Sequence, residues 1–596
     1  MEPVVEAEPL PPTRPAQGRS WLPGRLEAVI LFAAAFLFFL HFVHLRADFP
    51  NHSTWMDWAK YTDEGWYGDA AIRHYLLGHW NVPGDFNPAA ALPIWPLLEL
   101  ILFRFTGVSL VAARALSVAV FGLCLVCTYL LARRWPNVRR QDRERSGGAS
   151  QSVVPALTVL LLVANPFCYV FTRIAIVEPL LILLTLVALL VASKVGTLAA
   201  QVEGSEAEAG SEKLARRCWV WTGLLGILLP VMVLTKTTAI FLVPAIFWMA
   251  WAATGYRRRP FLRVAVSAVA VGALLWTAYY GLFVRPHFLV DYQYLFSANG
   301  YTKVTLPTLG AATRDVVAGA MLMGKPLFGL ALAAVVVVGA SWLDRRMRAN
   351  PLGVGLLLWI TGYSAFMVYH AAVPVRARYY LVIVVPYTLL VVLGFEPLML
   401  RAVRTVAVGW KQWRDLARAD VLAVLAGGAI AVVLLVGITK DVEMTVRFVR
   451  HPEYTFVNAA EGVREAVMRE SAEHPDHSKL VLSISGSDLS LITGLPSICD
   501  DFGTMELVDR VATYRPGWFA TWNDVEDDKM DALAPMYSLV RVAEFPAFDD
   551  PERNLLILYR LEPANPPSGS RRRGLSGSRR QRTRLGQQPR AAQLQH

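Results

Sequence analysis

The sequence predicts a polytopic α-helical membrane protein of about eleven transmembrane helices, followed by a small extracytoplasmic α/β domain. Of its 596 residues, 55% are hydrophobic and only 18% are charged, and the mean hydropathy is +0.39. These values are too apolar for a soluble chain of this length. Long apolar runs alternate with short basic loops, and the hydrophobicity falls only beyond residue 439.

The first apolar run, residues 25–45, is long enough to cross a bilayer and follows a polar stretch without a small-residue cleavage site. We therefore expect it to remain in the protein as a helix. The following apolar segments lie at 91–105, 110–131, 153–164, 174–192, 219–234, 240–253, 264–282, 328–342, 352–369, 379–400 and 421–439.

Arginine and lysine gather in the short loops 133–145, 213–218, 256–263, 343–348 and 401–420. Positive loops remain in the cytoplasm, and all five fall there only if the segment at 91–105 does not cross the membrane. That segment is short, is interrupted by Pro93 and Pro96, and carries Glu99 and Arg104, as an interfacial helix would. The N-terminus is then predicted inside and the C-terminus outside.

The expected organisation has four parts. They are a disordered cytoplasmic N-terminus (1–24), a transmembrane domain (25–439), an extracytoplasmic α/β domain (440–563) and a disordered basic tail (564–596). The tail contains many arginines and no acid, and it contributes much of the formal charge of +11. Such a tail is typical of solvated chain, with contact to anionic membrane lipids as the alternative, and we expect no nucleic-acid partner.

The α/β domain is predicted from a change of pattern. Residues 458–470 form an amphipathic helical repeat, and residues 479–485, 517–523, 538–545 and 554–561 are typical of strands. Trp518 and Trp522 in the second of these strands could stack on a sugar of an acceptor, although aromatic residues in strands are more commonly buried in the core.

Four polar clusters that are distant in the sequence fall on the external face under this topology. Ionisable residues are costly beside hydrocarbon, so four clusters on one face indicate a site. The clusters are YTDEGWYGDA at 61–70, Arg173 with Glu178, Lys236, and His370 with Arg376 and Arg378.

Together these stretches resemble the GT-C superfamily of polyprenyl-phosphate-dependent glycosyltransferases, in the branch of protein O-mannosyltransferases and aminoarabinose transferases. Asp63-Glu64 resembles the acidic motif of the family's first loop. TRIAIVEPL is similar to its Ser-Arg-x-x-x-x-Asp segment, VLTKTTAIFLVP to its Leu-x-Lys turn, and PVRARYYLVIVVP to its Arg-Tyr-x-x-x-x-Pro helix start. The resemblance covers roughly residues 26–400, but ALPIWPLLEL departs from the doubled proline usual after the first loop.

The resemblance implies an inverting transfer of a hexose or pentose from a polyprenyl phosphate to a glycan, lipid or protein acceptor on the extracytoplasmic face. Such a reaction needs a carboxylate that accepts the acceptor's proton and cations that hold the departing phosphate. The family position makes Asp63 the catalytic base, and Glu64 either orients the acceptor or tunes the charge of Asp63. Both could instead be solvated acids of the loop.

The cations expected at the donor phosphate are Lys236, Arg378, Arg376 and Arg173. Each also has a structural interpretation, because lysines near hydrocarbon mark the interface and arginines at helix ends anchor them. We favour Arg378 over Arg376, since it directly precedes the Tyr379 of the family pattern.

Supporting roles are expected for Glu178, Arg114, Tyr379 and Tyr67. Arg173 and Glu178 are five residues apart, about one and a half helical turns, so the spacing alone does not make them an ion pair. Arg114 also resembles a family position, and the aromatic side chains around Asp63 are expected to shape a pocket at the membrane surface.

No metal is expected to be required, although His74 and His79 could bind a divalent cation. Cys124 and Cys127 have CxxC spacing inside an apolar segment without a second pair, and we assign them no chemistry. The rival functions are a transporter, whose ionisable residues would lie near the bilayer midplane, and a membrane assembly factor for surface glycans that keeps only the fold.

Overall fold

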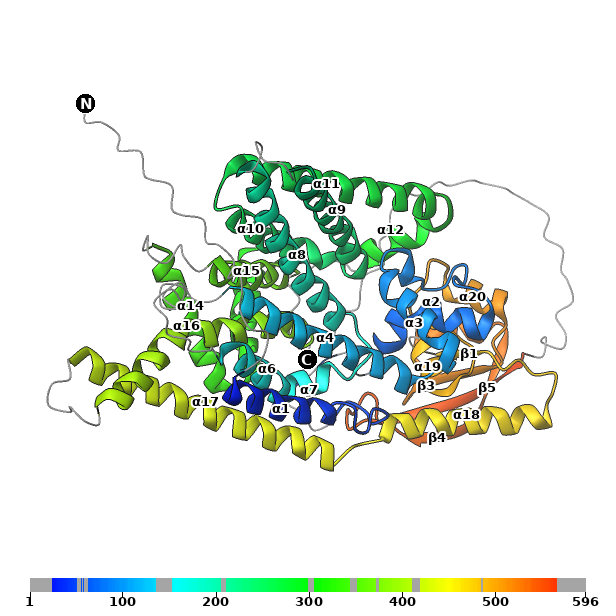
Figure 1. The fold of residues 1–596 in the computed structure, drawn as a ribbon. Coiled ribbons are helices and arrows are strands. Elements are labelled where there is room, and N and C mark those ends of the chain that lie inside the picture. The colour runs from blue at the N-terminus through cyan, green and yellow to red at the C-terminus, as the bar shows by residue number, and fades with distance from the viewer. Residues whose placement is uncertain are drawn as a thin grey trace, which may run out of the picture.

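A long bundle of helices carries a small α/β domain at one end (Figure 1). The structure is a computed structural model that describes residues 24–50, 55, 57, 60, 63–135, 153–204, 211–298, 305–343, 351–370, 375–409, 418–483 and 486–564. The tail after residue 564, the N-terminal 23 residues and the loop at 136–150 lie outside the described residues.

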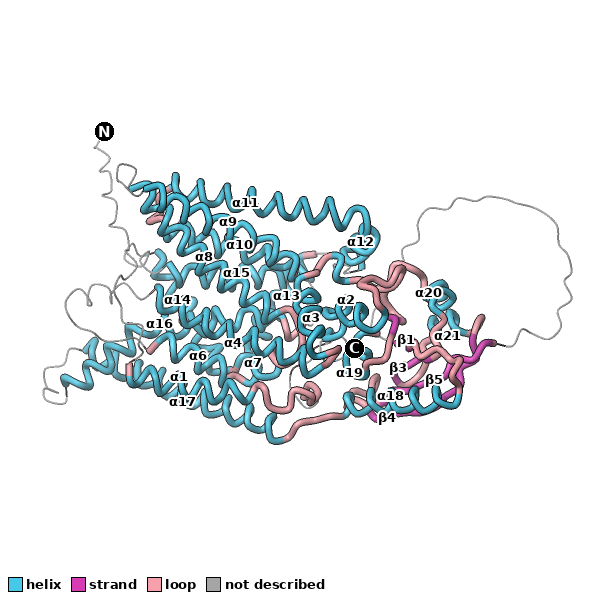
Figure 2. The backbone as a smooth tube through the Cα atoms, turned by 45° about the vertical axis from the view of Figure 1, so that its right-hand side comes forward, coloured by secondary structure: helices cyan, strands magenta, loops and turns pink. Residues whose placement is uncertain are grey.

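The bundle contains the following helices: α1 (Arg25–Leu40), α4 (Leu110–Arg134), α6 (Val154–Ala164), α7 (Pro166–Phe171), α8 (Glu178–Gly204), α9 (Ser211–Thr235), η3 (Thr237–Leu242), α10 (Val243–Ala253), α11 (Arg258–Tyr279), α13 (Leu306–Gly319), η5 (Ala320–Met323), α14 (Lys325–Leu343), α15 (Pro351–His370), α16 (Tyr379–Gly409) and α17 (Arg418–Arg450). Most of their long axes run in a similar direction, as Figure 2 shows.

The polytopic helical prediction is confirmed. Among the described residues, seven helical stretches are long and apolar enough to cross a membrane, and they begin at Leu110, Glu178, Ser211, Arg258, Pro351, Tyr379 and Asp420. The expected segments at 25–45, 153–164, 240–253 and 328–342 form shorter helices. The count of eleven crossings therefore stays a prediction.

The centre of the bundle is packed from apolar side chains of α4, α6, α7, α8, α10, α15 and α16. Local sequence signals explain where α7 begins. Asn165 caps α7, because its side chain accepts a hydrogen bond from the backbone N–H of Phe167 at 2.9 Å. Pro166 follows at the first helical position, where its missing N–H is not needed.

Three short elements of the first loop lie between the bundle and the α/β domain: α2 (Asp63–Leu77), η2 (Pro88–Ala90) and α3 (Ile94–Thr106). At 13 residues, α3 is too short to be one of the spanning stretches, as expected of the segment at 91–105. The π-helical η4 (Tyr280–Phe288) and α12 (Leu289–Ala298) continue α11 toward this region. There the side-chain amide of Asn87 donates to Asp291 at 2.9 Å.

The α/β domain follows α17, which continues to Arg450, past the boundary at 439 drawn from the sequence. Its elements are α18 (Thr455–Glu473), β1 (Val481–Ser483), α19 (Ser487–Thr493), β2 (Ser497–Cys499), α20 (Leu507–Tyr514), β3 (Trp518–Trp522), α21 (Asp527–Leu533), β4 (Tyr537–Pro546) and β5 (Leu555–Pro563). The predicted helix and the four predicted strands are all present, whereas the three-residue β2 was not anticipated.

The five strands form one mixed sheet in the order β2-β1-β3-β5-β4. β1 pairs in parallel with β2 and β3, and β5 pairs antiparallel with β3 and β4. Alternate residues of β3 face opposite sides: Trp518 packs in the core beneath α18, and Phe519 packs in the core beneath α20 and α21. Val82 of the first loop enters this second core, which ties the domain to the loop.

Candidate active site

Four helix ends meet at the end of the bundle that faces the α/β domain. Asp63 and Glu178 are the first residues of α2 and α8, Lys236 directly follows α9, and Arg378 directly precedes α16. Each of the four side chains is less than one tenth exposed. The fold therefore gathers charged residues from four distant parts of the sequence into one place.

Arg378 lies at the centre of this group. Its Nη1 is 2.7 Å from Asp63 Oδ2 and 2.7 Å from Asp57 Oδ1. The backbone N–H of Arg378 also donates to Asp57 Oδ2 at 2.7 Å. Because Asp57 holds both the side chain and the backbone of Arg378, the guanidinium is fixed where it faces Asp63.

Lys236 lies beside Arg378 and forms a second set of charged contacts. Its Nζ donates to Glu178 Oε1, and the Nε of Arg378 lies 3.8 Å from the same oxygen. The ammonium is 4.8 Å from the ring centre of Tyr379 and 5.9 Å from that of Tyr67, so two aromatic faces border it. The sequence-predicted Lys236, Glu178, Tyr379 and Tyr67 thus lie together.

The electrostatic environment of Asp63 favours a carboxyl group of increased basicity. Burial raises the pKa of Asp63, the charge of Arg378 opposes this, and Asp57 and Glu178 raise it further. Asp63 Oδ2 is buried and lies 2.7 Å from Arg378 Nη1, so the carboxyl group is held beside the guanidinium.

Glu64 points away from this group and binds Arg114. Arg114 Nε and Nη2 donate to the two carboxylate oxygens at 2.8 and 2.5 Å, and the backbone N–H of Ala175 donates to Oε1 at 2.8 Å. Arg114 also donates to the carbonyl oxygens of Leu45 and Ala47 at 2.8 and 2.6 Å. This buried pair therefore connects α2, α4 and the loop after α1.

Arg173 lies near the pair of Glu64 and Arg114 and not beside Lys236. It donates to the carbonyl oxygens of Val43 and His44, both at 2.6 Å, and to the hydroxyl of Tyr169 at 2.7 Å. These contacts hold the loop after α1 against the start of the α7–α8 connection. Arg376 is half-buried, two residues before Arg378, and the charges of Asp57 and Asp63 act on it.

Asp57 is a residue of the site that the sequence reasoning missed. It lies in STWMDWAKYT, six residues before Asp63, and its side chain is fully buried against Arg378. An acid between tryptophans in the same loop was the available signal. Asp48 and Asp488 were also missed. Asp488 accepts a hydrogen bond from the backbone of α2, and Asp48 accepts one from the backbone of α18.

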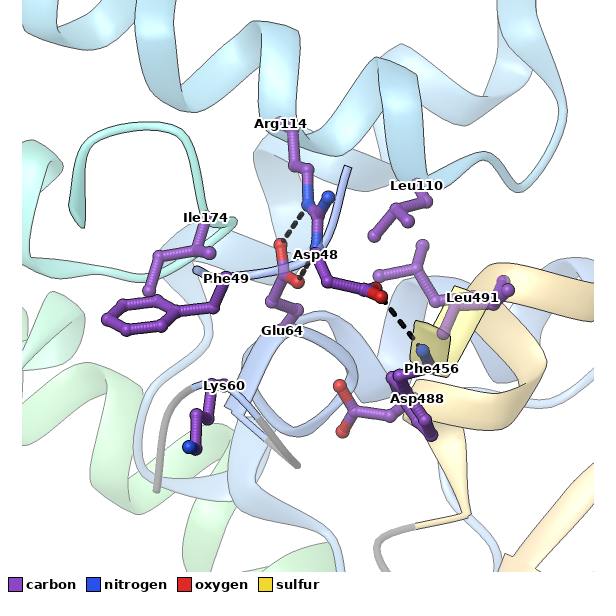
Figure 3. Close-up of a pocket in the computed structure, with 11 residues that line it drawn as sticks. Asp48, Phe49, Lys60, Glu64, Leu110, Arg114, Ile174, Phe456, Asp488 and Leu491 are labelled. Atoms are coloured by element: carbon purple, nitrogen blue, oxygen red, sulfur yellow. Dashed lines mark hydrogen bonds and ion pairs between the residues drawn. The ribbon is translucent and has the colours of Figure 1, made fainter. Parts of the chain in front are cut away.

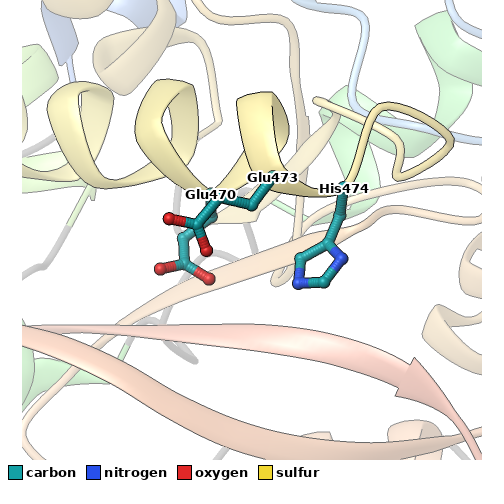
Figure 4. Close-up of side chains that lie close together, drawn as sticks. All are labelled: Glu470, Glu473 and His474. Atoms are coloured by element: carbon teal, nitrogen blue, oxygen red, sulfur yellow. The ribbon is translucent and has the colours of Figure 1, made fainter.

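The potential metal ligands lie elsewhere in the structure. Among the described residues, the one group of three potential metal ligands is Glu470, Glu473 and His474 on the surface of the α/β domain (Figure 4). His74 and His79 do not belong to such a group. Glu470 pairs with Arg560 at 2.7 Å, so the surface group has a structural explanation.

The indole of Trp518 is fully buried in the domain core and presents no face to a sugar. Trp522 is partly buried and packs against Phe456 and Phe548, with ring centres 5.6 and 5.7 Å away. Both side chains are therefore placed as core residues of the α/β domain.

Comparison with known proteins identifies the fold. No protein-family model and no curated protein sequence matches the chain. The structure of ArnT from Cupriavidus metallidurans bound to undecaprenyl phosphate superposes with a TM-score of 0.52 at 14% identity, over 89% of this chain and 97% of that one. The archaeal oligosaccharyltransferase AglB from Archaeoglobus fulgidus, in complex with an inhibitory peptide and a dolichol-phosphate, gives 0.48 at 13% identity, over 84% and 70%.

Proposed function

The chain has the GT-C membrane glycosyltransferase fold, and from this premise we propose that it transfers a sugar from a polyprenyl phosphate to an acceptor with inversion at the anomeric carbon. The undecaprenyl phosphate bound to ArnT supports a lipid phosphate as the carrier. The proposed sugar is a hexose or pentose, and the acceptor is a glycan, a lipid or a protein.

Asp63 is the proposed catalytic base. The acceptor oxygen attacks the anomeric carbon while its proton moves to the carboxylate of Asp63, and the bond between that carbon and the phosphate oxygen breaks. The electron pair of the broken bond remains on the phosphate, which leaves as polyprenyl phosphate. Support comes from the burial that raises the pKa of Asp63 and from the position of its carboxyl group beside Arg378.

Lys236 is the proposed principal contact of the donor phosphate. An ammonium group has three N–H donors, so Lys236 can bind a phosphate oxygen while it keeps Glu178. Arg378 is held by Asp57 and Asp63, and we assign it first to orienting the base and second to the phosphate. Arg376 is the further cation on this side, whereas Arg173 acts on the loop after α1.

The observation that carries this proposal is the meeting of Asp63, Lys236, Glu178 and Arg378 at helix ends. A transporter would place such residues along broken helices near the middle of the bilayer. An assembly factor without activity would retain the fold but release no undecaprenyl phosphate, which the experiment below measures.

The active site is proposed to face the extracytoplasmic side of the cell membrane. This assignment depends on basic residues, which belong in the cytoplasm. Among the described residues, Arg133 and Arg134 end α4 at the end opposite to Arg114, and residues 213–217 begin α9 at the end opposite to Lys236. A divalent cation is not assigned a step, because the proposed reaction needs only a base and a cationic phosphate site.

The experiment is a comparison of cells with and without the gene. Mass spectrometry of lipid-linked sugars and surface glycans should show one polyprenyl-phosphate sugar accumulating and one glycan feature lost in the deletion strain. The purified protein should then release undecaprenyl phosphate from that donor only when the matching acceptor is present. Unchanged donor and glycan pools would contradict the proposed function.

A further inference from the structure

Two helix N-termini are capped across the boundary between the first loop and the α/β domain. The first is that of α18. Asp48, in the loop after α1, accepts hydrogen bonds from the backbone N–H groups of Phe456 and Val457 at 2.8 and 3.2 Å. These are the second and third residues of α18, whose own N-cap residue Tyr454 makes no side-chain cap bond. A carboxylate in this position satisfies N–H groups that a helix leaves unpaired.

The second is the N-terminus of α2, the helix that begins at Asp63. The backbone N–H of Gly65, its third residue, donates to Asp488 Oδ1 at 3.0 Å. Asp488 belongs to α19 and is buried, and its neighbour Ser487 donates a hydrogen bond to Asp69 one turn further along α2. The α/β domain thus caps the helix that carries the proposed base.

Gly65 permits this approach because it has no side chain. A Cβ atom added at Gly65 would lie 2.1 Å from the backbone nitrogen of Asp488, which is far closer than any stable contact. The backbones of α2 and α19 are therefore in direct contact. The first turn of α2 cannot move relative to the α/β domain without breaking the bond from Gly65 to Asp488.

The two capping carboxylates line one small pocket, together with Glu64 and Arg114 (Figure 3). Asp48 comes from the bundle side and Asp488 from the α/β domain, so each part caps a helix of the other. Asp63 lies two residues before Gly65, a rise of about 3 Å along the helix. A displacement of that first turn would move Asp63 relative to Arg378 directly.

We propose that the α/β domain positions the catalytic base, with Asp488 acting as a positioning residue through the N–H of Gly65. Asp48 caps α18 and so holds the α/β domain in place against α2. This inference rests on the proposed function of Asp63. It gives the C-terminal domain a role in turnover that does not require it to touch the donor or the acceptor.

The test compares Asp488→Ala with Asp488→Asn in the full-length protein in lipid nanodiscs. Asparagine keeps an oxygen that can accept the hydrogen bond and caps helices as well as aspartate does, whereas alanine removes it. Undecaprenyl-phosphate mannose serves as hexose probe and an undecaprenyl-phosphate pentose as the alternative. Release of undecaprenyl phosphate, with extracted native membranes as acceptor, gives kcat and the donor KM.

We expect Asp488→Ala to lower kcat by about tenfold or more with little change in donor KM, because a small misplacement of a catalytic group is costly. Asp488→Asn should recover most of the rate. Glu473→Ala, on the exposed end of α18, is the matched control and should keep the wild-type kcat. If Asp488→Ala does not fold, Asp488→Ser takes its place, because it is a smaller change at the same hydrogen bond.

Hydrogen exchange supplies a readout independent of turnover. Peptides covering the start of α2 should exchange faster in Asp488→Ala than in the wild type or Glu473→Ala. If Asp488→Ala keeps both the wild-type kcat and the wild-type exchange while Asp63→Asn is inactive, the inference is overturned and the proposed function stands. If Asp63→Asn is fully active, the assignment of Asp63 as the base fails, and the inference loses its premise. If the wild-type protein releases no undecaprenyl phosphate from either donor, the proposed function itself fails.

Discussion

The buried pair of Glu64 and Arg114 gives a sharp prediction, because the sequence resemblance placed Glu64 among the catalytic residues and the structure surrounds it with donors. Three N–H groups point at its two oxygens, and the carboxylate and the guanidinium are 8% and 6% exposed. Replacing Arg114 with methionine leaves the Glu64 carboxylate buried without its cation. Removing one partner of such a pair costs about 3 to 5 kcal/mol of unfolding free energy.

A double-mutant cycle measures the pair itself. Arg114→Met and Glu64→Gln are combined, and unfolding in detergent micelles is followed for the four proteins. We expect a coupling free energy of at least about 2 kcal/mol, since the double variant no longer buries an unpaired charge. Glutamine at position 64 should also keep a measurable rate of sugar transfer, because its side-chain oxygen can still accept from Ala175.

The exposed pair of Arg401 and Asp420 is the matched control for this cycle. Its N–O distance is 2.8 Å, close to that of the buried pair, but its side chains are 52% and 30% exposed. Its coupling should therefore be below about 1 kcal/mol. Equal coupling in the two pairs would refute the structural role of Glu64, and so would loss of all turnover in a stably folded Glu64→Gln protein.

Three further predictions concern the site and its orientation. Lys236→Met should weaken binding of undecaprenyl phosphate by about 10- to 100-fold, since a charge-assisted contact contributes about 1.5 to 3 kcal/mol. Calorimetry measures the binding affinity. An equally large loss of affinity in Lys194→Met, at an exposed lysine, would contradict this role of Lys236. Burial raises the pKa of Asp63, the charge of Arg378 lowers it, and the charge of Asp57 raises it. Asp57→Asn should therefore move the acid limb of the kcat/KM profile to lower pH, and a shift to higher pH would contradict this prediction. A cysteine at Ser297 should react with an impermeant thiol reagent in intact cells and one at Arg263 should not, and the reverse labelling would overturn the proposed orientation.

Hydropathy and charge placement were sufficient to predict the helical bundle. Membrane helices hydrogen-bond their backbones internally, so long apolar runs such as 110–131 and 379–400 correspond to α4 and α16 whatever their neighbours. Period-two patterns likewise located β3 and β5. The three residues of β2 carry too short a pattern, and that strand forms because β1 supplies a parallel partner.

The composition of the site was only partly predictable. Lys236, Arg378 and Glu178 were identified because helix ends at one membrane face converge, a consequence of topology. Whether Glu64 or Asp63 faces Arg378 depends on helix rotation, which is set by the close contact of Gly65 with α19 more than 400 residues later in the chain. A long-range contact of that kind leaves no mark in the local sequence pattern.

The most direct test of the account is the separation of donor binding from turnover in purified Asp63→Asn protein. Asparagine keeps the shape of the side chain and removes the basic oxygen, so binding of undecaprenyl phosphate should stay within about twofold of wild type. Transfer to a hydroxyl acceptor should fall by about 100-fold or more. Transfer at the wild-type rate by the Asp63→Asn protein would contradict the assignment of Asp63 as the base.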